Sequence, residues 1–148
     1  MEIHLATDHA GFELKNTIME WLKGEGFSVH DHGAHEYDEL DDFPDFISLA
    51  AKAVSVDEED KGIVFGGSGQ GEAMVANRYP NVRCTVLYSA SEEMVRLGRE
   101  HNDSNMLSIG ARFVEEADAK RLIWEWLHAP VSEDEKYHRR NQKLSELP

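Results

Sequence analysis

Residues 64–74, VFGGSGQGEAM, contain the pattern that decides the fold. The run 62–65 is apolar throughout, as expected of a strand buried on both faces of a sheet. An apolar pattern at helical spacing follows from residue 73. Between the two stand four glycines and then an acid: Gly66, Gly67, Gly69, Gly71 and Glu72. The stretch therefore predicts a strand, a glycine-rich turn and a helix, the repeating unit of a parallel α/β sheet.

The rest of the chain repeats this alternation of short apolar runs and helical patterns. Strands are expected at 3–6, 27–29, 62–65, 82–87 and 106–109. Helices are expected at 11–23, at 46–54, after the glycine run, at 92–99 and at 115–127, before a basic helix at the C-terminus. No repeat, linker or low-complexity tract divides residues 1–148, so we expect one domain. The pattern predicts a three-layer αβα sandwich with a Rossmann-like, five-stranded parallel sheet.

The ligand site of such a sheet is expected at the carboxyl ends of its strands, near the point where the strand order reverses. This rule selects the loops after the first, third and fifth expected strands. These loops read DHAG, GGSGQGE and GAR. All three contain residue types that suit a polar ligand.

Composition limits the classes of function. The chain has 148 residues, 41% hydrophobic and 30% charged, which is typical of a globular domain. No apolar stretch approaches the roughly 20 residues that cross a bilayer, no signal peptide is apparent, and the single cysteine, Cys84, suits a reducing compartment. We therefore expect a cytoplasmic protein without a membrane partner. A net charge of −14 argues against nucleic acid as a partner.

The glycine run is predicted to bind an anion, because its backbone N–H groups and the following helix N-terminus attract negative charge. A tight turn that merely requires glycine is the simpler alternative. The Walker pattern fails, since no lysine followed by Ser or Thr closes the loop. The dinucleotide fingerprint fails because Glu72 stands at its third glycine position. A carboxylate beside an N–H nest suits an enediolate, whose oxygen charge the nest stabilises while the carboxylate moves a proton.

Five motifs in order resemble one family over nearly the whole chain: ATDHAGFELK, DDFPDF, GIVFGGSGQGEAMVANR, REHNDSNMLSIGAR and a basic tail. The sequence is similar to the B-type ribose-5-phosphate isomerases, whose wider family includes the galactose-6-phosphate isomerase subunits. The resemblance implies an aldose-ketose isomerase that works through a cis-enediolate without a metal or organic cofactor. It also implies a homodimer with its sites at the subunit interface. Further pairing of dimers into tetramers stays open.

The resemblance also implies roles for individual residues. One version of the family has a cysteine base directly after the third strand; here that position is Gly66, and Glu72 matches the glutamate base of the other version. Cys84 does not fill the vacant role, because it lies inside the fourth expected strand. The loop from Gly67 to Gly71, with Ser68, Gly69 and Gln70, matches the anion hole. Taken alone, Glu72 is also a favourable acid for the first turn of a helix.

Other matched positions surround this loop. His101 matches the acid that opens the sugar ring, and Asn102 matches a substrate-binding position, although both residues also suit a polar helix end. Asp8 and His9 match a pair that contacts substrate hydroxyls, and Asp8 also suits a helix cap. The phosphate ligands implied are Arg112, Lys136 and Arg140.

The tail departs from the family pattern Arg-His-x-x-Arg. Without a gap, Lys136 and Arg140 take the arginine positions and Tyr137 replaces the histidine. With a shift of one residue, His138 takes the histidine position instead. A solvated helix face is the alternative for the whole basic cluster.

Two further questions stay open in the sequence. His30, His32 and His35 suggest a metal site, but they fall in a turn that the family also has, so we expect no metal. The substrate is expected to be ribose 5-phosphate or ribulose 5-phosphate. A six-carbon phosphate, such as allose or galactose 6-phosphate, is an alternative, and so is a sugar-phosphate-binding protein without catalysis.

Overall fold

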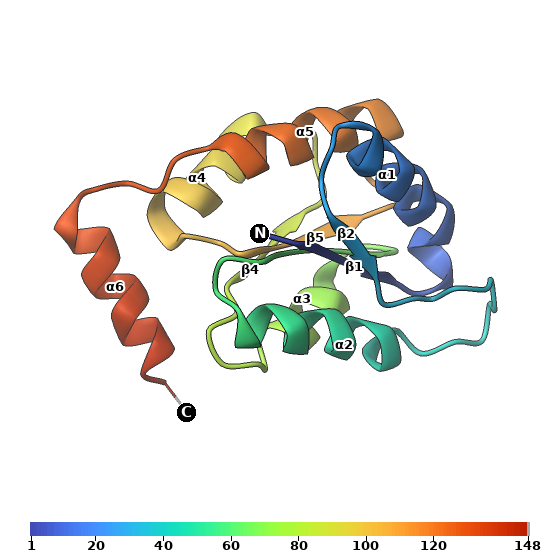
Figure 1. The fold of residues 1–148 in the computed structure, drawn as a ribbon, viewed down its shortest axis with the longest axis horizontal. Helices are drawn as coiled ribbons and strands as arrows, with labels where there is room; N and C mark the ends of the chain where they lie inside the picture. Colours follow the sequence, from blue (N-terminus) through green and yellow to red (C-terminus); the bar gives the residue numbers. More distant parts are fainter. Residues whose placement is uncertain (148) are drawn as a thin grey trace.

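The computed structural model of the protein describes residues 1–147. Its five strands form one sheet in the order β2-β1-β3-β5-β4, and every neighbouring pair is parallel. The strands are β1 (Ile3–Thr7), β2 (Val29–Asp31), β3 (Lys61–Gly66), β4 (Cys84–Leu87) and β5 (Met106–Gly110). The helices are η1 (His9–Gly11), α1 (Phe12–Gly24), α2 (Phe43–Val56), α3 (Gln70–Ala76), α4 (Glu92–Asn102), α5 (Glu116–His128) and α6 (Glu135–Ser145). Figure 1 shows α1, α4 and α5 on one face of the sheet and α2 and α3 on the other. The predicted three-layer sandwich is confirmed.

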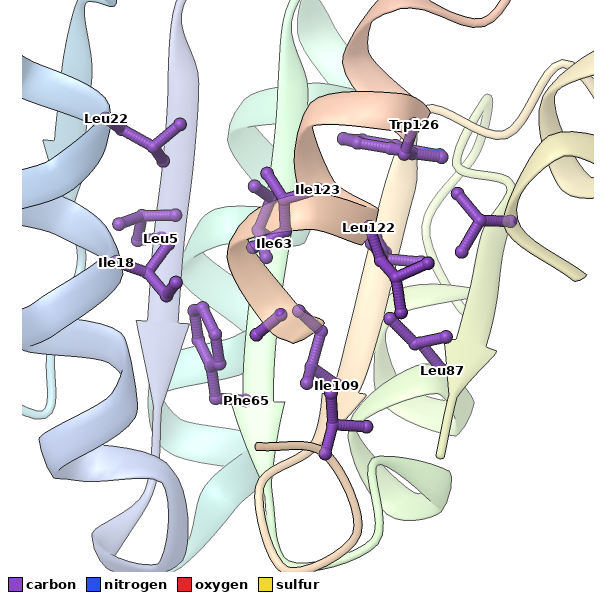
Figure 2. Packing of buried hydrophobic residues seen from close by; sticks show 14 of the residues in the cluster. Leu5, Ile18, Leu22, Ile63, Phe65, Leu87, Ile109, Leu122, Ile123 and Trp126 are labelled. Carbon is purple, nitrogen blue, oxygen red and sulfur yellow. The ribbon is translucent and has the colours of Figure 1, made fainter. Parts of the chain in front are cut away.

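Two apolar clusters fill the spaces between the layers, because alternate residues of a strand point to opposite faces. On β3, Ile63 and Phe65 face the larger cluster, whereas Val64 faces the smaller one. Figure 2 shows the larger cluster, in which Trp126 of α5 is fully buried. Its indole Nε1 donates to Ser104 Oγ over 2.8 Å, so the polar group of this core residue is satisfied.

The strand order reverses between β1 and β3. From β1 the chain crosses to β2 on one side, then returns to place β3 on the other side of β1. The loops that leave β1 and β3 therefore diverge and open a crevice at the carboxyl edge of the sheet. This position for the site agrees with the sequence prediction.

Several element boundaries differ from the prediction. The second strand lies at Val29–Asp31 instead of 27–29, because Phe27 packs against the larger core cluster instead of pairing with β1. Helix α2 begins earlier than expected, at Phe43, and has a proline in its first turn, where a missing N–H costs nothing. The fourth strand starts at Cys84 instead of residue 82. These differences leave the order of elements unchanged.

The C-terminal basic helix is present as α6, and it projects from the body of the molecule (Figure 1). It has no buried residue, although its sequence is amphipathic.

No helix within residues 1–147 combines the length and the apolar character needed to cross a membrane.

Candidate active site

The glycine run forms the turn between β3 and α3. Of the four glycines in the run, only Gly69 has a left-handed backbone, with φ +79°. The other three are glycines because of close neighbours. A Cβ on Gly71 would lie 2.8 Å from Cζ of Phe43, and one on Gly67 would lie 3.1 Å from Nη1 of Arg112.

Hydrogen bonds from β5 and from the loop that follows it hold the turn in place. Ser108 Oγ donates to the carbonyl of Gly69 over 2.6 Å, and the amide of Arg112 donates to the carbonyl of Gly67 over 3.1 Å. Within residues 1–147, the amides of Gly67, Ser68 and Gly69 have no hydrogen-bond acceptor. Fixed carbonyls and free N–H groups are what an anion hole requires.

Glu72 lies in the first turn of α3 with only 4% of its surface exposed. Burial raises the pKa of its carboxyl group, and the negative charge of Asp8 adds to this effect. The position in the helix alone would lower the pKa, so burial is the larger influence. A carboxylate with a raised pKa beside free N–H groups can accept a carbon-bound proton and return it.

Residues from three loops converge on a cavity of ≈ 440 Å³. Its lining includes Asp8, His9, Gly67, Ser68, Gly71, Glu72 and Arg112, all of which the sequence predicted. Asp8 also accepts from the amide of Ala10 over 2.9 Å, so its expected capping role is confirmed. Gln70, also predicted, is exposed and does not line this cavity.

Four residues at or near the cavity were not predicted: Ala10, Asp41, Phe43 and Phe113. Phe43 and Phe113 line the cavity, and the side chain of Asp41 lies against His9. Its hydrogen bond raises the pKa of His9. Phe43 belongs to the motif DDFPDF, which signals the family but does not indicate contact with the glycine run.

The remaining predicted residues do not reach this cavity within one chain. His101 and Asn102 end α4, and Lys136 and Arg140 lie on α6. Tyr137 stacks on the ring of His101 with centroids 4.1 Å apart, whereas His138 is exposed. The alignment without a gap puts Tyr137 at the histidine position of the family. In that alignment the residue at this position has its ring beside His101.

One of these residues, Asn102, borders a different feature. Asn102 lines a second groove, of ≈ 490 Å³, together with the end of α6. The Nζ of Lys136 lies 4.8 Å from the centre of the Tyr137 ring, and it also pairs with Asp134 over 2.9 Å. Within one chain, the predicted site residues thus form two separate groups.

The histidines of β1, of β2 and of the turn after β2 group differently from the expectation. The rings of His30 and His32 lie 4.4 Å apart, and the third member of this cluster is His4, not His35. The ligand atoms of Glu2, His4 and Asp60 all lie within 4.8 Å of one another. Their closeness is accounted for by a hydrogen bond of 3.1 Å between His4 Nε2 and Asp60 Oδ2.

Burial raises the pKa of the Cys84 thiol, which keeps it protonated and inert.

The ribose/galactose isomerase family matches residues 3–144. The chain belongs to this family. The resemblance stated from the motifs is therefore confirmed for the family as a whole.

Members of the ribose/galactose isomerase family are similar to this chain along almost its whole length. Ribose-5-phosphate isomerase B of Mycolicibacterium paratuberculosis is 39% identical over 146 residues, which cover 99% of this chain and 91% of the relative. The crystal structure of ribose-5-phosphate isomerase B from Mycoplasma genitalium with bound ribulose-5-phosphate is 34% identical, with a TM-score of 0.93. This match covers 98% of this chain and 94% of the Mycoplasma genitalium chain. The Clostridium thermocellum enzyme is 38% identical, with a TM-score of 0.91 over 99% of this chain and 96% of its own.

Proposed function

We propose that this protein is a type B ribose-5-phosphate isomerase that interconverts ribose 5-phosphate and ribulose 5-phosphate. The observation that carries the proposal is the buried carboxylate of Glu72, which lines the same cavity as Gly67 and Ser68, whose amides are free. Arg112 brings a guanidinium to the same cavity, and such a group suits a phosphate. The similarity to enzymes of that name over nearly the full chain supports the same substrate.

Glu72 acts as the general base in this proposal. In the open-chain aldose it removes the proton on C2, and the electron pair forms a C1–C2 double bond while the charge moves to the carbonyl oxygen at C1. The amides of the glycine run stabilise that charge in the cis-enediolate. Return of the proton to C1 and transfer of the hydroxyl proton from O2 to O1 complete the ketose. The reaction is balanced without an oxidant or an external reductant.

The functional unit is a homodimer whose sites include residues of both subunits. His101, Asn102, Lys136 and Arg140 lie outside the cavity of their own chain, and α6 leaves its amphipathic surface unburied. In the dimer these residues reach the cavity of the partner, where His101 opens the sugar ring and the basic residues bind the phosphate. This arrangement accounts for the two separate groups of predicted residues.

The first experiment follows conversion of ribose 5-phosphate to ribulose 5-phosphate by the purified protein with EDTA present, beside the Glu72→Gln variant. We expect wild-type turnover that survives EDTA and a variant slowed by about 10²- to 10⁴-fold. Turnover of allose or galactose 6-phosphate instead would assign the protein to six-carbon substrates. Binding of these phosphates without any turnover would identify a sugar-phosphate-binding protein.

A further inference from the structure

His9 is held by an acid that lies far from it in the sequence. Asp41 Oδ1 accepts two hydrogen bonds from this one residue: one from the His9 amide over 3.1 Å and one from the ring Nδ1 over 2.7 Å. The Asp41 side chain is only 7% exposed, whereas that of His9 is 27% exposed and lines the cavity. The ring is thus fixed on its buried side and open on the cavity side.

This contact determines where the proton of His9 lies. A carboxylate only accepts hydrogen bonds, so the short contact requires a proton on Nδ1. The other nitrogen, Nε2, has no hydrogen-bond partner within residues 1–147. It is therefore the atom that can bond a ligand in the cavity.

Asp41 has no competing partner among the described residues. Its second oxygen, Oδ2, is buried without a hydrogen bond in that part of the chain. A buried carboxylate in this state favours a positive charge on its one neighbour. The other groups that face His9 are the Asp8 carboxylate, at 3.9 Å from Nδ1, the Arg112 guanidinium, which opposes the charge, and the edge of Tyr37.

We propose that Asp41 is a positioning residue for the isomerase: it fixes the His9 ring with a proton on Nδ1 and presents Nε2 to an oxygen of the sugar phosphate. The inference rests on the proposed function for the identity of the ligand. Asp41 itself does not touch the substrate. Its effect on the reaction passes entirely through His9.

The ring can be tested directly in the wild-type protein. Nitrogen-15 NMR of the imidazoles, with His9→Gln to assign the signal, should show that neutral His9 carries its proton on Nδ1. A neutral ring with its proton on Nε2 would overturn the proposal, and this measurement requires neither a variant at residue 41 nor turnover.

A matched pair of variants tests the link to activity. Asp41→Asn keeps the size of the side chain and removes its charge. We expect the His9 titration to move to lower pH and KM for ribose 5-phosphate to rise roughly tenfold, with kcat changed much less. Asp42→Asn, at an exposed neighbouring acid whose side chain makes no capping bond, should change neither.

The two proposals fail in different ways. A folded Asp41→Asn protein in which the His9 titration is unchanged would refute the positioning role, whatever its activity. Absence of turnover by the wild-type protein would instead refute the proposed function and leave the NMR result valid.

Discussion

Gly66 and Glu72 share one space: a Cβ atom on residue 66 would overlap Cδ and Oε1 of Glu72. Gly66 is the last residue of β3, and Glu72 stands in the first turn of α3, so the glycine run brings the two together. The absence of a side chain at residue 66 is therefore what lets the carboxylate lie at the end of the strand. A cysteine at residue 66 and this position of Glu72 exclude each other on steric grounds.

Substitution of Gly66 by alanine should displace the carboxylate. We expect kcat to fall at least roughly 100-fold, the lower limit of a lost general base. Gly24→Ala is the control, because a Cβ at that residue meets nothing within 4 Å. A folded Gly66→Ala protein with wild-type kcat would show that Glu72 is not the base, or does not act from this position.

The pH dependence of kcat should report the ionisation of Glu72. A base must be deprotonated to act, and burial raises the pKa of this carboxyl above its ordinary value of 4.5. We therefore expect kcat to fall with decreasing pH while the pH is still above 4.5. The measurement is kcat over a pH series at saturating ribose 5-phosphate. Full activity down to pH 4.5 would contradict the assignment.

Glu72 should also cost the protein stability at neutral and alkaline pH. Its pKa is higher in the folded state than in the unfolded state, so the folded state binds more protons between these two pKa values. The free energy of unfolding therefore falls as the pH rises from the unfolded pKa through the folded pKa. Glu72→Gln removes the penalty, and we expect a higher Tm than that of the wild type at pH 8. The difference should shrink as the pH falls toward 4.5. Glu58→Gln, at an exposed acid, should show no such trend.

The histidine cluster should limit stability in acid. Burial lowers the pKa of His32 from 6.5 to about 4, and the nearby His30 and His4 contribute. Between these values the unfolded state binds the proton first, so stability present above pH 6.5 is lost as the pH falls toward 4. His32→Gln should flatten this part of a curve of Tm against pH. His35→Gln, whose side chain is 67% exposed in the wild type, serves as the control, and equal curves for both variants would refute the assignment.

The proposed sharing of sites between subunits predicts that two inactive variants restore each other. Mixed dimers of Glu72→Gln and His101→Ala contain one site with both residues intact. Statistical exchange of subunits should then recover about a quarter of wild-type activity. The assay is turnover after the two proteins are unfolded together and refolded. If both residues act within one chain, the mixture should stay inactive.

The sequence by itself determined the sandwich, the edge of the sheet that carries the site, and most of the cavity lining. These follow from local patterns: the apolar character of 62–65, the glycines that precede Glu72, and a positional rule for parallel sheets. The loops that hold Asp8 and Arg112 were predicted from their position after strands, whereas the roles of these two residues came from the family resemblance. Motifs carried the family assignment for the same reason, since their order along the chain is visible without a structure.

Only the tertiary structure decided which distant residues touch. Asp41 reaches His9 across 32 positions, and Phe43 covers Gly71, yet no periodicity links either pair. The loop between β2 and α2 brings both residues to the cavity, and its path depends on how the two layers pack. His101 and Arg140 likewise stay apart from Glu72 in one chain, since neither α4 nor α6 contributes a residue to the cavity that Glu72 lines. Spacing along a sequence encodes contacts within an element, whereas contacts between elements arise only when the layers close on a common core.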